Sequence, residues 1–256
     1  MGAGDVEVNV DSANAKAGAF FDGTDDRVDV GAAGALDIDP LISISAWVKV
    51  DNIVGVKTII SNRPNGTDYW DFLITTAAIR WTGEIGNVGD STTSGAVMVA
   101  REWTHVTVTY NDTTKTTNIY KNGVNIVLND TLSDPVLAAH GGQGMIGTIE
   151  QNPLAENFKG EISEVKVWNR ILTPAEVLQD YNGIQITDGR IHRWELKSDY
   201  TDEKGTADGT NAGSRLGIYD DTIAAAVAAD RTTSDDIYMI AMSANNQAIT
   251  TIIDET

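Results

Sequence analysis

The chain has 256 residues, of which 41% are hydrophobic and 21% are charged. The length allows one large or two small folded domains. The high hydrophobic fraction excludes wholesale disorder, which combines low hydrophobicity with high net charge. The formal net charge is −19, and a field of this sign repels phosphate backbones and anionic lipid surfaces. We therefore predict no nucleic-acid partner, and no membrane insertion because no apolar run approaches the roughly 18 residues of a span. The absence of cysteine excludes disulfides and thiolate metal sites.

Short runs of alternating apolar and polar residues predict strands along the chain. Residues 42–50 and 103–110 alternate throughout. Residues 115–120 and 124–128 flank an Asn-Gly dipeptide, which favours a tight hairpin turn. Residues 161–168 alternate in the same way. The pattern predicts an all-β, two-sheet antiparallel jelly-roll sandwich.

One segment has helical spacing instead. Thr173 suits the N-cap, Pro174 suits the first helical position, and Glu176 completes a capping box. Gly183 is placed to end the helix. The sequence therefore predicts one short helix after the strand at 161–168.

The chain beyond this helix is predicted to form a small C-terminal extension. Residues 223–229 are a second candidate helix, and residues 237–242 with 248–253 predict a closing hairpin. We divide the chain into a jelly roll over residues 1–182 and a C-terminal segment over residues 183–256.

Four motifs stand in a fixed order along the chain. They are FDGTDDRV at residues 21–28, ISAWV at 44–48, EWTHV with IYKNG at 102–106 and 119–123, and FKGEISEVKVWNR at 158–170. Together they resemble the laminin-G-like, concanavalin A-like jelly rolls. The resemblance implies two antiparallel sheets packed face to face, a mostly non-catalytic domain that often binds glycans, and often one calcium ion.

A fifth match lies in an unusual place. Residues 192–196 (HRWEL) and the acidic turn up to Asn211 are similar to a segment that precedes the FDG motif in these domains. Two interpretations stay open. Residues 190–214 complete the same sandwich, as in a circular permutation, or residues 190–256 form a separate unit for partner or oligomer contacts.

Catalysis is not predicted. Glycan-cleaving relatives carry acidic residues at positions i, i+2 and i+4 of one strand, which places all three on one face. The nearest match here is Glu161, Ser163 and Val165, with one carboxylate in place of three. We therefore predict that the protein is not an enzyme.

A calcium site is a possible feature of the FDG turn. Asp22, Asp25 and Asp26 surround a glycine and could converge their oxygens on a cation. The resemblance implies a further acidic ligand at the position of Ser163, which this chain lacks. The alternative is a plain acidic turn whose Asp side chains bind their own backbone.

Two tryptophans lie outside all five of these matches. A flat ring beside polar groups is what sugar binding requires, so Trp70 and Trp81 are candidate ligand-binding residues, with Asp68, Asn65 and Arg63 beside them. The alternative for both tryptophans is structural packing.

The predicted function is non-catalytic recognition and display, with glycans or a host-surface receptor as partners. The N-terminal residues have neither the basic nor the apolar region of a secretory signal, so we predict a virion surface or extracellular location. Capsid proteins and further copies of the chain are the other predicted partners. The alternatives are a purely structural decoration protein and a secreted or cell-surface carbohydrate-binding module.

Overall fold

The computed structural model describes residues 17–64, 67–86, 88–134, 136–149, 156–217, 238–242 and 248–252. The chain divides into two compact units. One unit is Gly18–Gly217, and the other combines Met1–Ala17 with Ile218–Thr256. In the second unit, β16 (Tyr238–Met242) and β17 (Ala248–Ile252) pair antiparallel, as the sequence predicts. The candidate helix at 223–229 lies outside the described residues.

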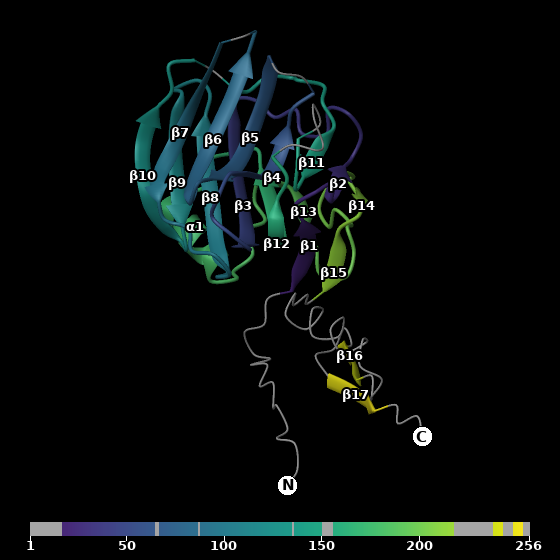
Figure 1. The fold of residues 1–256 in the computed structure, drawn as a ribbon. Coiled ribbons are helices and arrows are strands. Elements are labelled where there is room, and N and C mark those ends of the chain that lie inside the picture. The colour runs from purple at the N-terminus through teal and green to yellow at the C-terminus, as the bar shows by residue number, and fades with distance from the viewer. Residues whose placement is uncertain are drawn as a thin grey trace. The chain divides into compact units, whose positions relative to one another are not determined.

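The first unit is a sandwich of two antiparallel sheets (Figure 1). Sheet A has the spatial order β10 (Val124–Thr131), β9 (Thr116–Lys121), β8 (Thr104–Asn111), β3 (Leu41–Val50), β12 (Lys159–Trp168), β1 (Gly18–Asp22) and β15 (Arg215–Gly217). An eighth strand, β13 (Arg190–Trp194), pairs with the second half of β12. Sheet B has the order β14 (Gly209–Ala212), β2 (Arg27–Val30), β11 (Gly144–Ile146), β4 (Val56–Asn62), β5 (Asp68–Thr75), β6 (Ala78–Ile85) and β7 (Val88–Ala96).

Alternation along the strands builds the core between the sheets. In β3, Ile42, Ile44 and Val48 are completely buried and face sheet B. In β5, Trp70 and Phe72 are completely buried and face sheet A. Burying one face of each sheet is the usual driving force of a sandwich. The predicted all-β jelly roll is confirmed.

The five alternating runs are all strands, and the two that flank the Asn-Gly dipeptide form the predicted hairpin. They correspond to β3, β8, β9 with β10, and β12. Alternation did not identify β4–β7 or β11, which make up most of sheet B. The glycine of the FKG motif has a physical role, because Gly160 has a φ of +133° and a Cβ there would lie 2.0 Å from the carbonyl oxygen of Lys49.

The predicted helix is α1 (Pro174–Tyr181), and its capping box is complete. The Thr173 hydroxyl accepts a hydrogen bond from the Glu176 amide, and the Glu176 carboxylate accepts one from the Thr173 amide. Gly183 follows the C-cap with a φ of +83°. None of the helices in the described part of the chain is long and apolar enough to cross a membrane.

Residues 190–217, beyond the helix, contribute strands to the sandwich. β13 pairs with β12, β14 pairs with β2, and β15 pairs with β1. Trp194 on β13 is completely buried, and its indole nitrogen donates to the carbonyl oxygen of Ala207 at 2.8 Å. The compact unit therefore extends to Gly217, whereas the division based on the sequence ended the jelly roll at residue 182.

Candidate functional site

The outer face of sheet B carries a row of polar residues. The register places Ser61 of β4 opposite Asp71 of β5, Asp71 opposite Thr82 of β6, and Thr82 opposite Ser91 of β7. Residues opposite one another share a face of the sheet. Because Trp70 points into the core, its neighbour Asp71 and the rest of this row lie on the outer face.

Arg63, directly after β4, lies over this row. Its Nη1 donates to Oδ2 of Asp71 at 2.9 Å and lies 3.5 Å from Oε2 of Glu156. Its guanidinium carbon lies 4.2 Å from the centre of the Tyr69 ring, within the range of a cation–π contact. We call Arg63, Tyr69, Asp71, Arg80 and Glu156 the Arg63 cluster. The side chain of Asp71 is completely buried, whereas those of Arg63 and Glu156 are 18% and 28% exposed.

Burial dominates the electrostatics of the Arg63 cluster. It raises the pKa of the Asp71 carboxyl to about 7, although the positive charge of Arg63 acts in the opposite direction. The charge of Glu156 also raises this pKa, and that of Arg80 lowers it. A strongly shifted carboxyl with identified charged neighbours is typical of functional sites.

Three buried polar atoms of the Arg63 cluster have no hydrogen-bond partner among the residues that the structure describes. They are Oδ1 of Asp71, Nε of Arg63 and Nε of Arg80. Such atoms are uncommon in folded proteins because an unsatisfied buried polar group is costly. Within the described residues, these three atoms are donors and an acceptor that the cluster itself does not use.

The two candidate tryptophans do not form a sugar-binding surface. Trp70 and Trp81 are both completely buried in the core. Their rings stack with centroids 5.5 Å apart, and Trp81 also packs against Tyr110. The prediction of a ligand-binding role is wrong for both, because strand alternation turns these rings inward.

The other predicted ligand-binding residues have different outcomes. Arg63 is part of the Arg63 cluster. Asp68 lies at the start of β5 and accepts hydrogen bonds from the Gly86 amide at 3.0 Å and from the Thr67 hydroxyl at 3.0 Å. The bond from Gly86 braces the turn between β6 and β7. Asn65 lies outside the described residues.

The acidic turn brings its three carboxylates together. Oxygens of Asp22, Asp25 and Asp26 lie within 4.8 Å of one another. Burial raises the pKa of Asp26, and the charges of Asp22 and Asp25 raise it further. A Cβ on Gly213 would lie 2.1 Å from Oδ1 of Asp26, so this glycine keeps space beside that oxygen. The oxygen donors and their negative charge suit a calcium ion.

Backbone bonds also hold this turn, as the alternative interpretation predicts. Oδ2 of Asp26 accepts from the Asp22 amide, and Oδ1 of Asp22 accepts from the Thr24 amide, each at 2.7 Å. Ser163 donates its hydroxyl to the carbonyl oxygen of Glu195 at 3.0 Å. These backbone hydrogen bonds are compatible with a calcium site, since each bond uses one oxygen of a carboxylate and the other oxygen could bind the ion.

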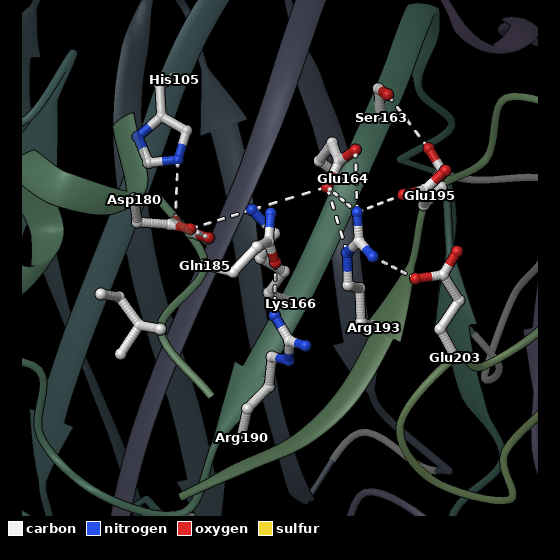
Figure 2. Close-up of polar contacts among 12 residues, drawn as sticks. His105, Ser163, Glu164, Lys166, Asp180, Gln185, Arg190, Arg193, Glu195 and Glu203 are labelled. Atoms are coloured by element: carbon white, nitrogen blue, oxygen red, sulfur yellow. Dashed lines mark hydrogen bonds and ion pairs between the residues drawn. The ribbon is translucent and has the colours of Figure 1, made fainter. Parts of the chain in front are cut away.

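The outer face of sheet A carries a separate charged network (Figure 2). Asp180 of α1 accepts from Lys166 Nζ at 2.9 Å and from the Ser45 hydroxyl at 2.7 Å, and it lies 3.2 Å from His105 Nε2. Burial opposes ionisation of Asp180, but its hydrogen bond with His105 and the charge of Lys166 hold its pKa well below the usual range. This end of the network fastens α1 to sheet A.

The other end of the network fastens β13 to β12. Arg193 contacts the carboxylates of Glu164, Glu195 and Glu203. Figure 2 shows these side chains converging on the guanidinium. Because acids and bases pair within the network, we assign it a structural role.

Comparison with known proteins agrees with this architecture. A sequence model of the concanavalin A-like lectin/glucanase superfamily (Laminin_G_3) matches residues 22–178. The chain belongs to this superfamily. By sequence, this lectin-like chain matches no curated protein.

Three solved structures illustrate the shared fold. A Bacteroides ovatus protein, described as a candidate carbohydrate-binding protein, aligns with a TM-score of 0.63 and 20% identity over 78% of this chain and 59% of its own. The CBM40 module of a Ruminococcus gnavus IT-sialidase, bound to α2,3-sialyllactose, aligns with a TM-score of 0.54 and 15% identity over 64% of this chain and 96% of its own. A heptameric pentraxin from Limulus polyphemus aligns with a TM-score of 0.55 and 15% identity over 82% and 97%, respectively. This chain spans less than two thirds of the Bacteroides protein.

The strand that carries three acidic residues in glycan-cleaving members corresponds to β12, where positions 161, 163 and 165 are Glu, Ser and Val. Glu161 is 4% exposed, and its carboxylate accepts from Lys49 Nζ at 2.8 Å. Val165, two positions after Ser163, is buried in the core. This lectin-like domain therefore lacks the row of carboxylates on β12 that cleavage by such members requires.

The sequence reasoning identified Arg63 but missed Tyr69, Asp71, Arg80 and Glu156. One pattern could have identified two of them. If Trp70 and Phe72 face the core, then Tyr69 and Asp71 must face outward. No local pattern marks Glu156, which comes from a distant loop and reaches Arg63 through the fold.

Proposed function

We propose that this chain is a non-catalytic glycan-binding module and that the Arg63 cluster is its binding site. The proposal is supported by membership of the lectin/glucanase superfamily and by a fold shared with a CBM40 module that binds sialyllactose. The observation that carries it is the Arg63 guanidinium, partly exposed and fixed between the Tyr69 ring and the Asp71 carboxylate.

The cluster can bind sugars by hydrogen bonding. A guanidinium offers five N–H donors in a rigid plane. The contacts of Arg63 with the Tyr69 ring and the Asp71 carboxylate restrict its movement. A donor that is already held in place loses less conformational entropy when a ligand binds. The exposed edge of Arg63 can therefore donate to sugar hydroxyls with little reorganisation.

Substitution of Arg63 tests this function. We expect Arg63→Gln to weaken glycan binding at least tenfold, because it removes a charge-assisted donor. The measurement is a glycan microarray followed by isothermal titration calorimetry. Arg101→Gln is the matched control, since its side chain is 78% exposed and lies outside the cluster. Equal affinities of the two variants would contradict the assignment of the site.

The absence of catalysis is a separate part of the proposal. The support is that Glu161 is the one carboxylate among positions 161, 163 and 165 of β12 and is paired with Lys49. We expect no release of reducing sugar from any glycan that the protein binds. Release that Glu161→Gln abolishes would show instead that the chain is a glycosidase.

We also propose that the acidic turn binds one calcium ion. Asp22, Asp25 and Asp26 would supply carboxylate oxygens, and the ion would offset the repulsion among three negative charges. Its role would be to stabilise the junction between β1 and β2.

Display on a virion and assembly into a homo-oligomer stay predictions. Size-exclusion chromatography with light scattering tests the second of these. A stable trimer or larger oligomer would support repeated weak sites acting together. A monomer would favour the alternative of a single carbohydrate-binding module.

A further inference from the structure

The charges around the Arg63 cluster do not favour an anionic ligand. Arg63 and Arg80 are the cations, and Asp71, Glu84 and Glu156 are the carboxylates. Glu84 joins this group because it lies opposite Tyr69 and raises the pKa of the Tyr69 hydroxyl. The two arginines are thus matched by Glu84 and Glu156, with Asp71 as a third acid whose pKa is about 7, in a chain whose formal net charge is −19.

The exposed edge of the cluster pairs a donor with an acceptor. Nη1 of Arg63 and Oε2 of Glu156 are 3.5 Å apart, which is longer than a strong charge-assisted hydrogen bond. Both side chains reach solvent. A hydroxyl group that lies beside the pair and contacts both atoms can accept from the guanidinium and donate to the carboxylate, because a hydroxyl does both. A carboxylate ligand can only accept, so Glu156 would repel it.

Asp71 acts through Arg63. It is completely buried, so a ligand at the surface does not reach it, but its Oδ2 accepts the hydrogen bond that fixes the guanidinium. Burial raises the pKa of its carboxyl to about 7, so its main effect on a ligand is exerted through the guanidinium that it holds. Asp71 is therefore a positioning residue.

We propose that the Arg63 cluster selects uncharged sugars and rejects carboxylated ones, with Glu156 as the residue that discriminates between them. This inference rests on the proposed glycan-binding function. It assigns the ligand class, neutral oligosaccharides with free hydroxyl groups, in contrast to sialylated or uronic-acid-containing glycans.

The test is a microarray of matched pairs, each a neutral oligosaccharide and the same oligosaccharide capped with sialic acid. We expect the wild-type protein to bind the neutral member at least tenfold more tightly. Glu156→Gln should reduce this preference at least threefold, because it removes the repulsion and keeps a hydrogen-bonding group of similar size. Glu102→Gln is the matched control, since it removes one negative charge from an exposed residue outside the cluster.

The outcomes separate this inference from the function on which it rests. If the wild-type protein binds no glycan on the array, the proposed function fails and the inference with it. If it binds glycans but prefers the sialylated members, the function stands and the inference is wrong. The inference is also wrong if Glu156→Gln and Glu102→Gln change the preference equally, because net charge alone would then explain it. Circular dichroism of each variant confirms that the fold is intact.

Discussion

Environment, more than residue type, decides what individual side chains do in this protein. Trp70 and Asp71 are neighbours in β5, and both are completely buried, yet they lie on opposite faces of sheet B. The indole packs in the core, whereas the carboxylate meets two arginines on the outer face. Composition drew attention to the tryptophan, but alternation places its neighbour in the proposed site.

At this scale the first prediction concerns the pH dependence of stability. The folded protein holds the Asp71 proton up to about pH 7, whereas the ordinary pKa is 3.8. Between these values the folded state binds more protons than the unfolded state, so this group's stabilising contribution decreases as pH rises. The contribution is fully present below pH 4 and amounts to about 4 kcal/mol, most of which is lost by pH 7.

Urea denaturation of wild type and Asp71→Asn between pH 4 and pH 8 measures this contribution. Asn does not titrate, so the wild type should lose stability relative to the variant as pH rises. Glu102→Gln, which removes an exposed carboxylate, should follow the wild-type curve. Parallel curves for wild type and Asp71→Asn would mean that Asp71 is ionised throughout.

The acidic turn supports a second prediction at the residue scale. If it binds calcium, millimolar calcium should raise the thermal midpoint relative to EDTA, since a ligand that binds only the folded state stabilises it. Asp25→Asn should abolish most of this increase, because it removes one of the three converging carboxylates. Asp134→Asn provides a control outside the turn. If the thermal midpoint is the same in calcium and in EDTA, the turn does not bind calcium and its backbone hydrogen bonds alone hold it.

At the scale of elements, local chemistry predicts α1 well. The order Thr173, Pro174 and Glu176 gave its start, and the observed capping box matches. Its docking could not be predicted, because Asp180 binds Ser45, His105 and Lys166 from three different strands. Neighbouring residues determine a helix cap, so it can be predicted from local sequence. Contacts between distant segments depend on the complete fold.

Loss of the N-cap gives a third prediction. Thr173→Ala removes the hydroxyl that accepts from the Glu176 amide and should lower the free energy of unfolding by about 1 kcal/mol. Thr187→Ala is the control, since Thr187 is exposed and lies outside the helix. Chemical denaturation measures both. A cost below that of the control would show that the docked helix does not depend on its cap.

The turn between β5 and β6 explains why sequence patterns missed this hairpin. Its central residues, Thr76 and Ala77, have φ values of 45° and 66°. Positive φ at both positions is typical of the type I′ turn, which usually carries Asn-Gly. The sequence lacks that dipeptide here, whereas the β9–β10 hairpin has it at Asn122 and Gly123 and was predicted.

The same turn supplies a fourth prediction. Thr76 is exposed and β-branched, so its left-handed conformation is strained and contributes no buried surface in return. Thr76→Asn should stabilise the protein by about 0.5–1 kcal/mol, since Asn tolerates this conformation. Thr93→Asn, at an exposed position of β7, is the control and should not stabilise the protein. Thermal denaturation of both variants distinguishes them.

At the scale of the molecule, both ends of the sandwich lie side by side at one edge of sheet A. Gly18 at the start of β1 pairs with Gly217 at the end of β15. The late strands therefore complete sheets that the early strands begin. The sequence showed this only as two open interpretations, because the fifth motif lies after the helix and pairing between the chain's ends leaves no local pattern.

This topology predicts which fragments fold. A fragment of residues 18–217 contains both sheets of the sandwich and the whole described core, so it should unfold cooperatively and keep any glycan binding that the full chain shows. A fragment of residues 1–182 ends after α1 and loses β13, β14 and β15. It also loses Trp194, whose buried ring contributes roughly 3–5 kcal/mol by analogy with other buried aromatics. We expect the shorter fragment to aggregate or to lack a cooperative transition in calorimetry. If it unfolds cooperatively instead, residues 183–217 are an addition to a sandwich that is already complete, and the circular-permutation interpretation is wrong.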